Sequence, residues 1–203
     1  MLLNLDELTV KYSLNIKGVL HIGAHHGHEN TDYSRLGITN KIFFEPAPDN
    51  FKILEQRVQD GSLLVNKALG NTNGVAEMFI ERANHGQSNS LLEPGTHLTQ
   101  YPHITFNESV QVEVIKLDDF DFDRSTFNFI NIDVQGYELE VFKGASNTLH
   151  TVDYIMAEIN RDEVYKGCGQ IEEVQAFLAP YGFELVEQFW FGGTWGDGFF
   201  IKK

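Results

Sequence analysis

The sequence predicts an α/β fold in which a mostly parallel sheet carries helices on both faces. Short apolar segments alternate with helical segments along most of the 203 residues, and this alternation is typical of parallel sheets. Two late strands with no helix between them, at 183–186 and 198–201, indicate an antiparallel edge. The length and the 42% hydrophobic content fit one domain that spans residues 1–203 and has its own core.

Each element follows from local spacing and from turn residues. Apolar residues at helical spacing predict helices at 5–12, 29–36, 50–59 and 170–180. The first lies in an entry segment at 1–17, and we expect Asp49 to cap the third. Apolar runs predict strands at 18–22, 41–45, 62–66, 127–132 and 152–159, and alternation predicts extended segments at 74–80 and 110–115.

Residues 82–106 show no period and are rich in Gly, Ser, Asn, His and Pro. A loop of this length inside a compact domain is often functional. We expect it to cover a bound substrate; a disordered surface loop is the alternative. Specificity is expected in this loop and in 188–197.

Residues 131–145 are the most informative stretch of the chain. A buried strand ends on Asp133, and a glycine turn and an acidic helix start follow. Ligands of open α/β sheets bind outside the carboxyl ends of the strands. Asp133 therefore lies where chemistry is expected. Glu138 and Glu140 are expected to favour the helix dipole.

A glycine loop near the N-terminus indicates a nucleoside-containing cofactor. Gly23 and Gly27 follow the first core strand, and Glu45 lies 22 residues after Gly23, at the end of the second strand. An acidic residue at that place accepts hydrogen bonds from ribose hydroxyls. The dinucleotide pattern G-x-G-x-x-G is not met, because Ile22 and Ala24 occupy two of its glycine positions. A looser turn and a glutamate suit S-adenosylmethionine (SAM), which carries no pyrophosphate.

Five blocks together resemble the FkbM-type family of SAM-dependent methyltransferases. They fall in the family's order at 19–27, 43–46, 66–70, 88–92 with 117–120, and 131–145. The resemblance implies a Rossmann-like class I methyltransferase fold, a sheet of about seven strands whose last strand is antiparallel. It also implies methylation of a hydroxyl on a sugar, glycan or other small molecule.

The resemblance also implies where the cofactor binds. The matching positions are Gly23, Ala24, His25, Gly27, Glu45, Pro46, Ala68, Leu69, Ser88 and Asp133. Glu45 would hold the ribose, Ala68 and Leu69 would lie near the adenine, and Asp133 would face the methionine part and the acceptor. His21, His25, His26 and Gln135 depart from the residues usual in the family.

Three residues are candidates for catalysis: Asp133, Glu158 and His85. Asp133 and Glu158 end strands that neighbour each other in this fold, so one of them could accept a proton. With Asn160 they could also hold Mg²⁺. The alternatives are that Asp133 caps the next helix and that Glu158 pairs with Arg161 or a backbone amide.

The histidine-rich segment is not predicted to bind a metal. His21 lies in a strand, whereas His25, His26 and His28 lie in or near a turn, so no converging geometry is evident and no metal ligand is assigned. His25 or His26 could still reach a substrate as a base. Near the last glycines, Trp190, Phe191 and Trp195 would either stack on a sugar or pack at the sheet edge.

Bulk composition excludes several classes of function. The formal net charge is −14, so nucleic acid and anionic lipid are not expected partners. There is no apolar run of about 18 residues for a membrane span. The first residues lack a basic signal-peptide region, and Cys168 is the only cysteine. We therefore expect a cytoplasmic protein, with its oligomeric state left open.

Two further functions stay open from the sequence. One is an NAD-dependent oxidoreductase of a sugar, which the missing glycine pattern disfavours. The other is an inactive module that binds SAM or another ligand without turnover.

Overall fold

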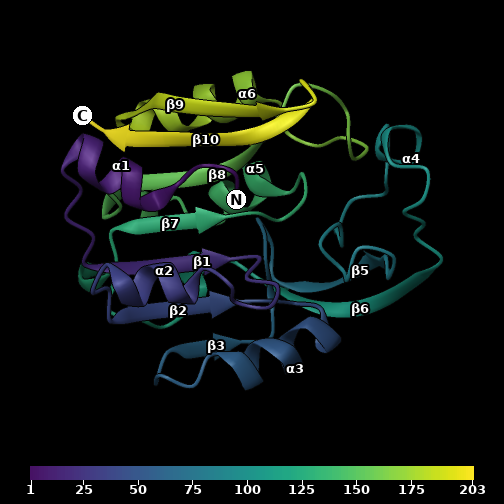
Figure 1. Ribbon diagram of the computed structural model, residues 1–203, viewed down its shortest axis with the longest axis horizontal. Helices are drawn as coiled ribbons and strands as arrows, with labels where there is room; N and C mark the ends of the chain where they lie inside the picture. Colours follow the sequence, from purple (N-terminus) through teal and green to yellow (C-terminus); the bar gives the residue numbers. More distant parts are fainter.

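A computed structural model describes residues 1–203 and contains two sheets (Figure 1). The strands of the large sheet are, in spatial order, β3 (Leu63–Val65), β2 (Asn40–Phe44), β1 (Gly18–Ile22), β7 (Phe129–Ile132), β8 (Tyr154–Asn160), β10 (Trp195–Lys202) and β9 (Phe183–Phe191). The small sheet has the order β4 (Ala68–Leu69), β6 (Glu108–Ile115) and β5 (Gly74–Ile80). The predicted α/β class is confirmed.

The antiparallel strand is β10, but it does not form the edge of the sheet. It lies between β8 and β9 and runs antiparallel to both, so β9 is the edge strand. The reason is the β9–β10 hairpin, which turns at Gly192 and Gly193, both with positive φ. This tight turn folds the last strand back beside β8. Both strands of the hairpin are longer than the sequence predicts.

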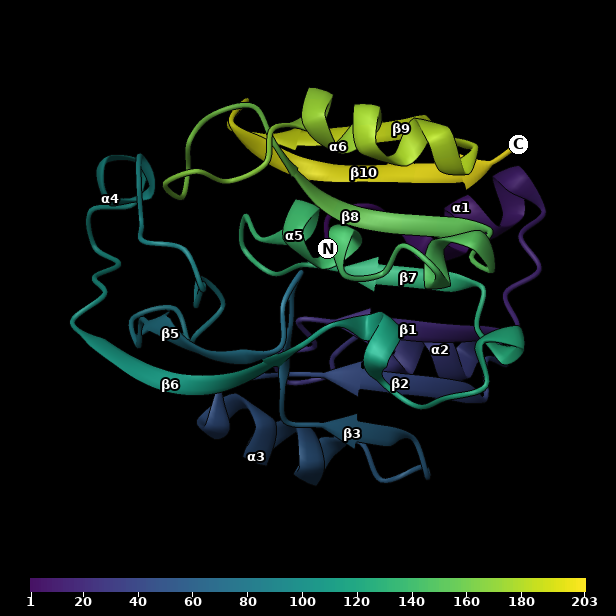
Figure 2. The ribbon, with the colours of Figure 1, turned by 180° about the vertical axis from the view of Figure 1, so that it is seen from behind.

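Helices cover both faces of the large sheet (Figures 1 and 2). On one face lie α1 (Leu5–Tyr12), α2 (Asn30–Arg35) and α3 (Pro48–Arg57); on the other lie α5 (Glu138–Lys143) and α6 (Ile171–Leu178). Each face has its own core, because successive strand residues point to opposite sides. Val19 packs with the α1–α3 face, whereas Leu20 and Ile22 pack with the α5–α6 face. No helix combines the length and the apolar character that crossing a membrane requires.

The predicted cap of the third helix is wrong. The helix begins at Pro48. Proline is suited to the first turn, because backbone N–H groups at that position have no partner within the helix and proline has no N–H. Asp49 therefore lies inside the first turn and caps nothing; it contacts Lys52 and Arg82 instead. A four-residue helix, α4 (His97–Gln100), appears in the segment expected to be structureless. Four short 3₁₀ turns complete the secondary structure: η1 (Leu117–Asp119), η2 (Arg124–Thr126), η3 (Thr148–His150) and η4 (Ala179–Tyr181).

A close contact between two glycines joins the small sheet to α5. Gly144 ends α5, and a Cβ added to it would lie 1.9 Å from the carbonyl oxygen of Gly70, the residue that follows β4. The backbones can approach this closely only because no side chain stands between them. The contact therefore sets the distance between α5 and the small sheet.

We expect Gly144→Ala to destabilise the fold by about 1–3 kcal/mol, the usual cost of forcing extra atoms into a packed contact. Chemical denaturation followed by circular dichroism measures this loss. Gly74→Ala is the matched control, because a Cβ there would meet nothing within 4 Å. Equal stability of the two variants would show that the Gly144–Gly70 approach does not constrain the fold.

Candidate active site

The candidate site lies where the strand order of the large sheet reverses. The chain passes from β1 outward to β2 and β3, and then returns to place β7 on the other side of β1. Loops leaving β1 and β7 therefore diverge and leave a crevice at their carboxyl ends. Gly23, with φ of +79°, follows β1 and would clash with the Asp133 carbonyl if it carried a Cβ. Glycine at this position lets the two loops touch.

Glu45 holds the loop that follows β1. Its carboxylate accepts hydrogen bonds from the backbone N–H of His25 (2.7 Å) and of Ala47 (2.8 Å). The side chain is only 4% exposed, and this burial raises its pKa to about 7. The residue thus connects the ends of β1 and β2 and also lines the crevice.

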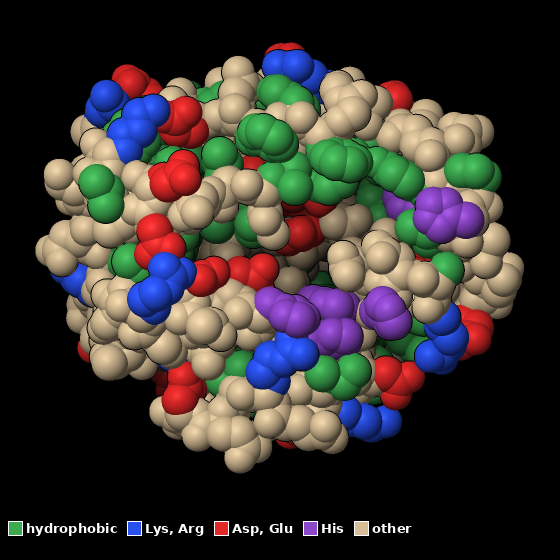
Figure 3. All heavy atoms as spheres, viewed as in Figure 1, with side chains coloured by type: hydrophobic (Ala, Val, Ile, Leu, Met, Phe, Trp, Pro, Cys, Tyr) green, Lys and Arg blue, Asp and Glu red, His purple; other side chains and the backbone are tan.

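The crevice opens into a cavity of about 690 Å³, and Figure 3 shows the hollow with acidic side chains inside and histidines on its rim. Nine of the ten predicted cofactor-binding residues line it: Gly23, Ala24, His25, Glu45, Pro46, Ala68, Leu69, Ser88 and Asp133. Gly27 does not line it. A Cβ on Gly27 would press on Leu54 and Val58, so this glycine fits the turn against α3.

The candidate catalytic carboxyls meet on the far side of the cavity. Asp133 follows β7, and Glu158 lies in β8, the neighbouring strand. The side-chain amide of Gln135 donates to both, at 2.7 Å to Asp133 and 2.8 Å to Glu158. Gln135 has φ of +54°, and its amide oxygen is 2.7 Å from the Tyr165 hydroxyl. Gln135 therefore fixes the separation of the two carboxyls.

Glu158 is buried beside a second acidic group. Burial is the main cause that raises its pKa well above the ordinary value, and the charge of Asp133 adds to this. The protonated form of Glu158 is therefore favoured. Neither alternative role for Glu158 is observed: Arg161 lies over the Trp190 ring instead, and the recorded partner of the Glu158 side chain is Gln135.

Glu138 is buried beside the cavity loop, whereas the sequence suggested a residue that acts on the helix dipole. It is 2% exposed, and its Oε1 accepts the backbone N–H of Val134 (2.9 Å) and of Gly136 (3.3 Å). Burial raises its pKa to about 7. It therefore holds the 133–137 turn in shape instead of acting mainly on the helix dipole. The sequence analysis did not assign Glu138 and Gln135 to the site. Their closeness to Asp133 in the sequence is the feature that could have indicated them.

The structure brings three of the four clustered histidines together. The rings of His25 and His26 stack with centroids 3.6 Å apart, and His28 lies 6.4 Å from His25. This convergence was not expected from the sequence. His21 points elsewhere: it is buried and lies 3.2 Å from the Tyr33 hydroxyl. The His25 ring also contacts the His85 carbonyl at 2.8 Å. Stacked imidazoles pack well against each other, and we assign no metal to them.

His85 is not placed as a base. Its side chain is exposed and does not line the cavity. It contributes its backbone carbonyl to His25, and its positive φ of 57° belongs to a tight turn. The sequence could suggest a histidine in a functional loop, but only the fold shows that this residue does not line the cavity.

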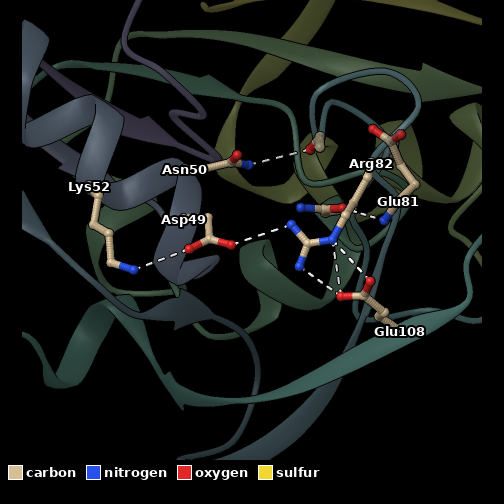
Figure 4. Close-up of polar contacts among 8 residues, drawn as sticks. Asp49, Asn50, Lys52, Glu81, Arg82 and Glu108 are labelled. Atoms are coloured by element: carbon tan, nitrogen blue, oxygen red, sulfur yellow. Dashed lines mark hydrogen bonds and ion pairs between the residues drawn. The ribbon is translucent and has the colours of Figure 1, made fainter.

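Residues 82–106 form an ordered wall of the cavity. Ser90 pairs with Phe79 of β5, and Pro94 pairs with Tyr165. Figure 4 shows how the start of this segment is tied to α3 and β6. Asn50 donates to the Gly86 carbonyl at 3.4 Å. Asn89, Ser90 and His97 are buried. The alternative of a disordered surface loop is therefore not supported.

Arg82 bridges the two parts of the molecule at the same place (Figure 4). Its guanidinium lies 2.7 Å from Glu108 of β6 and 3.5 Å from Asp49 of α3. All three side chains are exposed, so each pair contributes little stability by itself. Beside this bridge, Asn50 donates to the Gly86 carbonyl, and the Asn89 side chain accepts the backbone N–H of Glu81, which follows β5.

The fold and the site together define a Rossmann-like domain with a cavity of about 690 Å³ at its switch point. Residues 21–185 match the Methyltransferase FkbM domain, so the chain belongs to this family. The family assignment makes it a SAM-dependent methyltransferase and disfavours the NAD-dependent alternative.

Two named relatives are similar in sequence. The chain is 27% identical over 187 residues to the 2-O-methyltransferase NoeI of Sinorhizobium fredii, covering 84% of this chain and 74% of the relative. It is 25% identical over 124 residues to the hexuronic acid methyltransferase AglP of Haloferax volcanii, covering 60% of this chain and 47% of the relative. The chain thus matches about half of the second relative's length.

Solved structures show the same fold. Magnesium protoporphyrin IX methyltransferase from Synechocystis PCC 6803, solved with bound SAM, matches with a TM-score of 0.56 and 8% identity over 98% of this chain and 76% of that one. The PH0226 protein of Pyrococcus horikoshii matches with a TM-score of 0.55 and 10% identity over 98% and 88%. At these identities the likeness concerns the fold alone.

The buried Glu138 predicts a specific dependence of stability on pH. Because its folded-state pKa is raised from 4.5 to about 7, the contribution of Glu138 to the free energy of unfolding is largest below about pH 4.5 and is lost as the pH rises through about 7. Glu138→Gln keeps an oxygen for both N–H groups and removes the charge. We expect the fall across this window to shrink by up to about 1.4 kcal/mol per pH unit.

Urea denaturation at several pH values measures this slope. Glu140→Gln is the control, since Glu140 lies on the same helix and bonds Lys143 and Asn71 near the surface. Identical slopes in wild type and Glu138→Gln would contradict the assignment of a buried, titrating Glu138.

Proposed function

We propose that this protein transfers a methyl group from SAM to a hydroxyl of a sugar, glycan or related small molecule. The observation that carries the proposal is the pair Asp133–Glu158, which lies in the same cavity as Glu45 but on the other side of the switch point. The two named relatives, a 2-O-methyltransferase and a hexuronic acid methyltransferase, support a sugar hydroxyl as the acceptor.

The cavity residues fit the cofactor. Glu45 offers a buried carboxylate to ribose hydroxyls, and Ala68 and Leu69 offer an apolar surface to the adenine. Gly23 and Ala24 present backbone close to the cavity because they carry little or no side chain. Bound SAM supplies a methyl group activated by a sulfonium, so the remaining task of the protein is to position a hydroxyl and remove its proton.

Asp133 and Glu158 have different roles in that task. Burial and the neighbouring Asp133 raise the pKa of Glu158, which favours its protonated form. In that form it donates a hydrogen bond and does not accept the proton of the acceptor. We assign proton acceptance to Asp133, whose side chain is less buried and lines the cavity. Gln135 donates to both groups and keeps them apart at a constant distance.

The same residues do not fit Mg²⁺. The carboxyl oxygens of Asp133, Glu138 and Glu158 lie within 4.8 Å of one another, which by itself suits a cation. However, Gln135 directs its amide hydrogens at two of the three groups, and Glu138 is committed to two backbone amides. A cation would have to displace these donors. We therefore propose methyl transfer without a divalent metal.

Two finer assignments belong to the same proposal. Residues 82–106 line the cavity opposite the sheet and are proposed to cover the bound acceptor. A cytoplasmic location is proposed because Cys168, the only cysteine, is buried and free, which suits a reducing compartment.

Calorimetry with SAM, S-adenosylhomocysteine and NAD, each with and without Mg²⁺, tests the cofactor part. We expect micromolar binding of the first two, no binding of NAD and no effect of Mg²⁺. Glu45→Ala should weaken binding by about 1–3 kcal/mol, as expected for lost hydrogen bonds to a charged group. The exposed Glu55→Ala is the control. No affinity for either sulfur compound would refute the proposal, and a Mg²⁺ requirement would restore the metal site.

Turnover of the two carboxyl variants tests the catalytic part. Asp133→Asn should lower kcat by about 10²-fold or more, the contribution of a positioned base. Glu158→Gln should cost much less, because an amide resembles the protonated acid. Methyl transfer to a pyranoside acceptor, followed by mass spectrometry, measures both. A larger loss in Glu158→Gln would reverse the two roles, and absence of turnover with every acceptor would favour the inactive module.

A further inference from the structure

The acceptor half of the cavity has an aromatic wall made by segments far apart in the sequence. Phe191 ends β9, Trp195 begins β10, and Tyr101 follows α4; all three line the cavity. Phe191 and Trp195 are cross-strand partners with ring centroids 5.2 Å apart. The indole N–H of Trp195 donates to the Tyr101 hydroxyl at 2.8 Å. This bond satisfies the polar edge of the indole and fixes its orientation.

The wall stands beside the carboxyl pair. In the sheet register, Trp195 lies opposite Asn160 and Asp197 lies opposite Glu158. The aromatic rings thus continue the same sheet edge that carries the carboxyls. A sugar ring needs both features, since its C–H face packs on aromatic rings and its hydroxyls bond to polar groups.

A buried polar atom without a partner lies in the same region. His97 is 3% exposed, lines the cavity and packs against Tyr101 with centroids 5.1 Å apart. Its Nδ1 has no hydrogen-bond partner in the protein, and burial lowers the pKa of the ring. A neutral buried imidazole nitrogen without a partner is costly. A ligand hydroxyl would satisfy it.

Phe191 is unusual because it is large, apolar and 49% exposed. Trp190, the adjacent aromatic residue, does not line the cavity, and its ring is covered by the Arg161 guanidinium at 3.7 Å. Because successive residues of a strand point to opposite faces, Trp190 and Phe191 lie on different sides of β9. Trp190 packs at the edge, whereas Phe191 and Trp195 face the cavity.

We propose that Phe191, Trp195 and Tyr101 form an acceptor subsite that stacks on the apolar face of a pyranose ring, and that His97 Nδ1 hydrogen-bonds one of its hydroxyls. The inference rests on the proposed function and adds to it the ring form of the acceptor and the residues that select it. An open-chain polyol offers the same hydroxyls but no rigid face, so the subsite discriminates against it.

The experiment compares Phe191→Ala with Phe189→Ala. Phe189 lies two residues earlier on the same strand and is 51% exposed, but it does not line the cavity, which makes it a matched control. The probes are methyl pyranosides of glucose, galactose, mannose and fucose, with sorbitol as the open-chain comparison. We expect Phe191→Ala to raise the KM for a pyranoside roughly tenfold, with S-adenosylhomocysteine affinity within twofold of wild type. Phe189→Ala should match wild type in both.

Binding is also measured without turnover. Trp190→Phe leaves Trp195 as the only indole of the two in the chain, so its fluorescence reports on the wall. In the presence of S-adenosylhomocysteine, pyranosides should change this fluorescence and sorbitol should not. His97→Phe, which keeps the aromatic packing and removes the nitrogen, should weaken pyranoside binding.

Two outcomes would overturn the inference while leaving the cofactor assignment intact. One is an equal KM in Phe191→Ala and Phe189→Ala. The other is normal S-adenosylhomocysteine binding with no pyranoside response at 50 mM. Loss of S-adenosylhomocysteine binding by the wild-type protein would instead overturn the proposed function.

Discussion

The parallel pairing of β1 with β7 is the constraint on which the rest of this structure depends. It places the carboxyl ends of two strands that are more than 100 residues apart in the sequence within one hydrogen-bonded ladder. Gly23 and Asp133 then touch through their backbones, and the two loops that leave them must diverge. The cavity is the space that this divergence creates. A side chain at Gly23 would clash with the Asp133 backbone and force the two loops apart.

Around this crevice the protein concentrates buried acidic groups, which is costly in a chain of net charge −14. Glu45, Glu138 and Glu158 are each less than 5% exposed. Their pKa values are raised chiefly by burial. Backbone amides satisfy Glu45 and Glu138, and a side-chain amide satisfies Glu158. This arrangement favours the protonated form of Glu158 beside Asp133, and it is the basis for the different roles that we propose for the two carboxyls.

The two halves of the cavity are lined by different kinds of residue. The half over β1 and β2 is built from small residues and one buried carboxylate, as a nucleoside requires. The half over β7, β8 and β10 combines carboxyls with aromatic rings contributed by the final hairpin and by residues 82–106. In our proposal, cofactor binding depends on the early, regular units of the fold. Acceptor binding is proposed to depend on the irregular segments, which can vary without disturbing the sheet.

Much of the fold and of the cofactor half was predictable from the sequence, because local rules act over short distances. Apolar runs located the strands, the spacing from Gly23 to Glu45 indicated the loop beside the cavity, and the 131–145 block indicated the family. Nine of the ten residues predicted to bind the cofactor line the cavity for this reason.

What only the tertiary structure decided are contacts between distant segments. It shows that β10 lies inside the sheet, that Glu138 is buried, and that Gln135 spans Asp133 and Glu158. It also shows that His85 does not line the cavity. Burial and side-chain direction arise from how the segments pack on one another, and no local pattern in the chain encodes that packing.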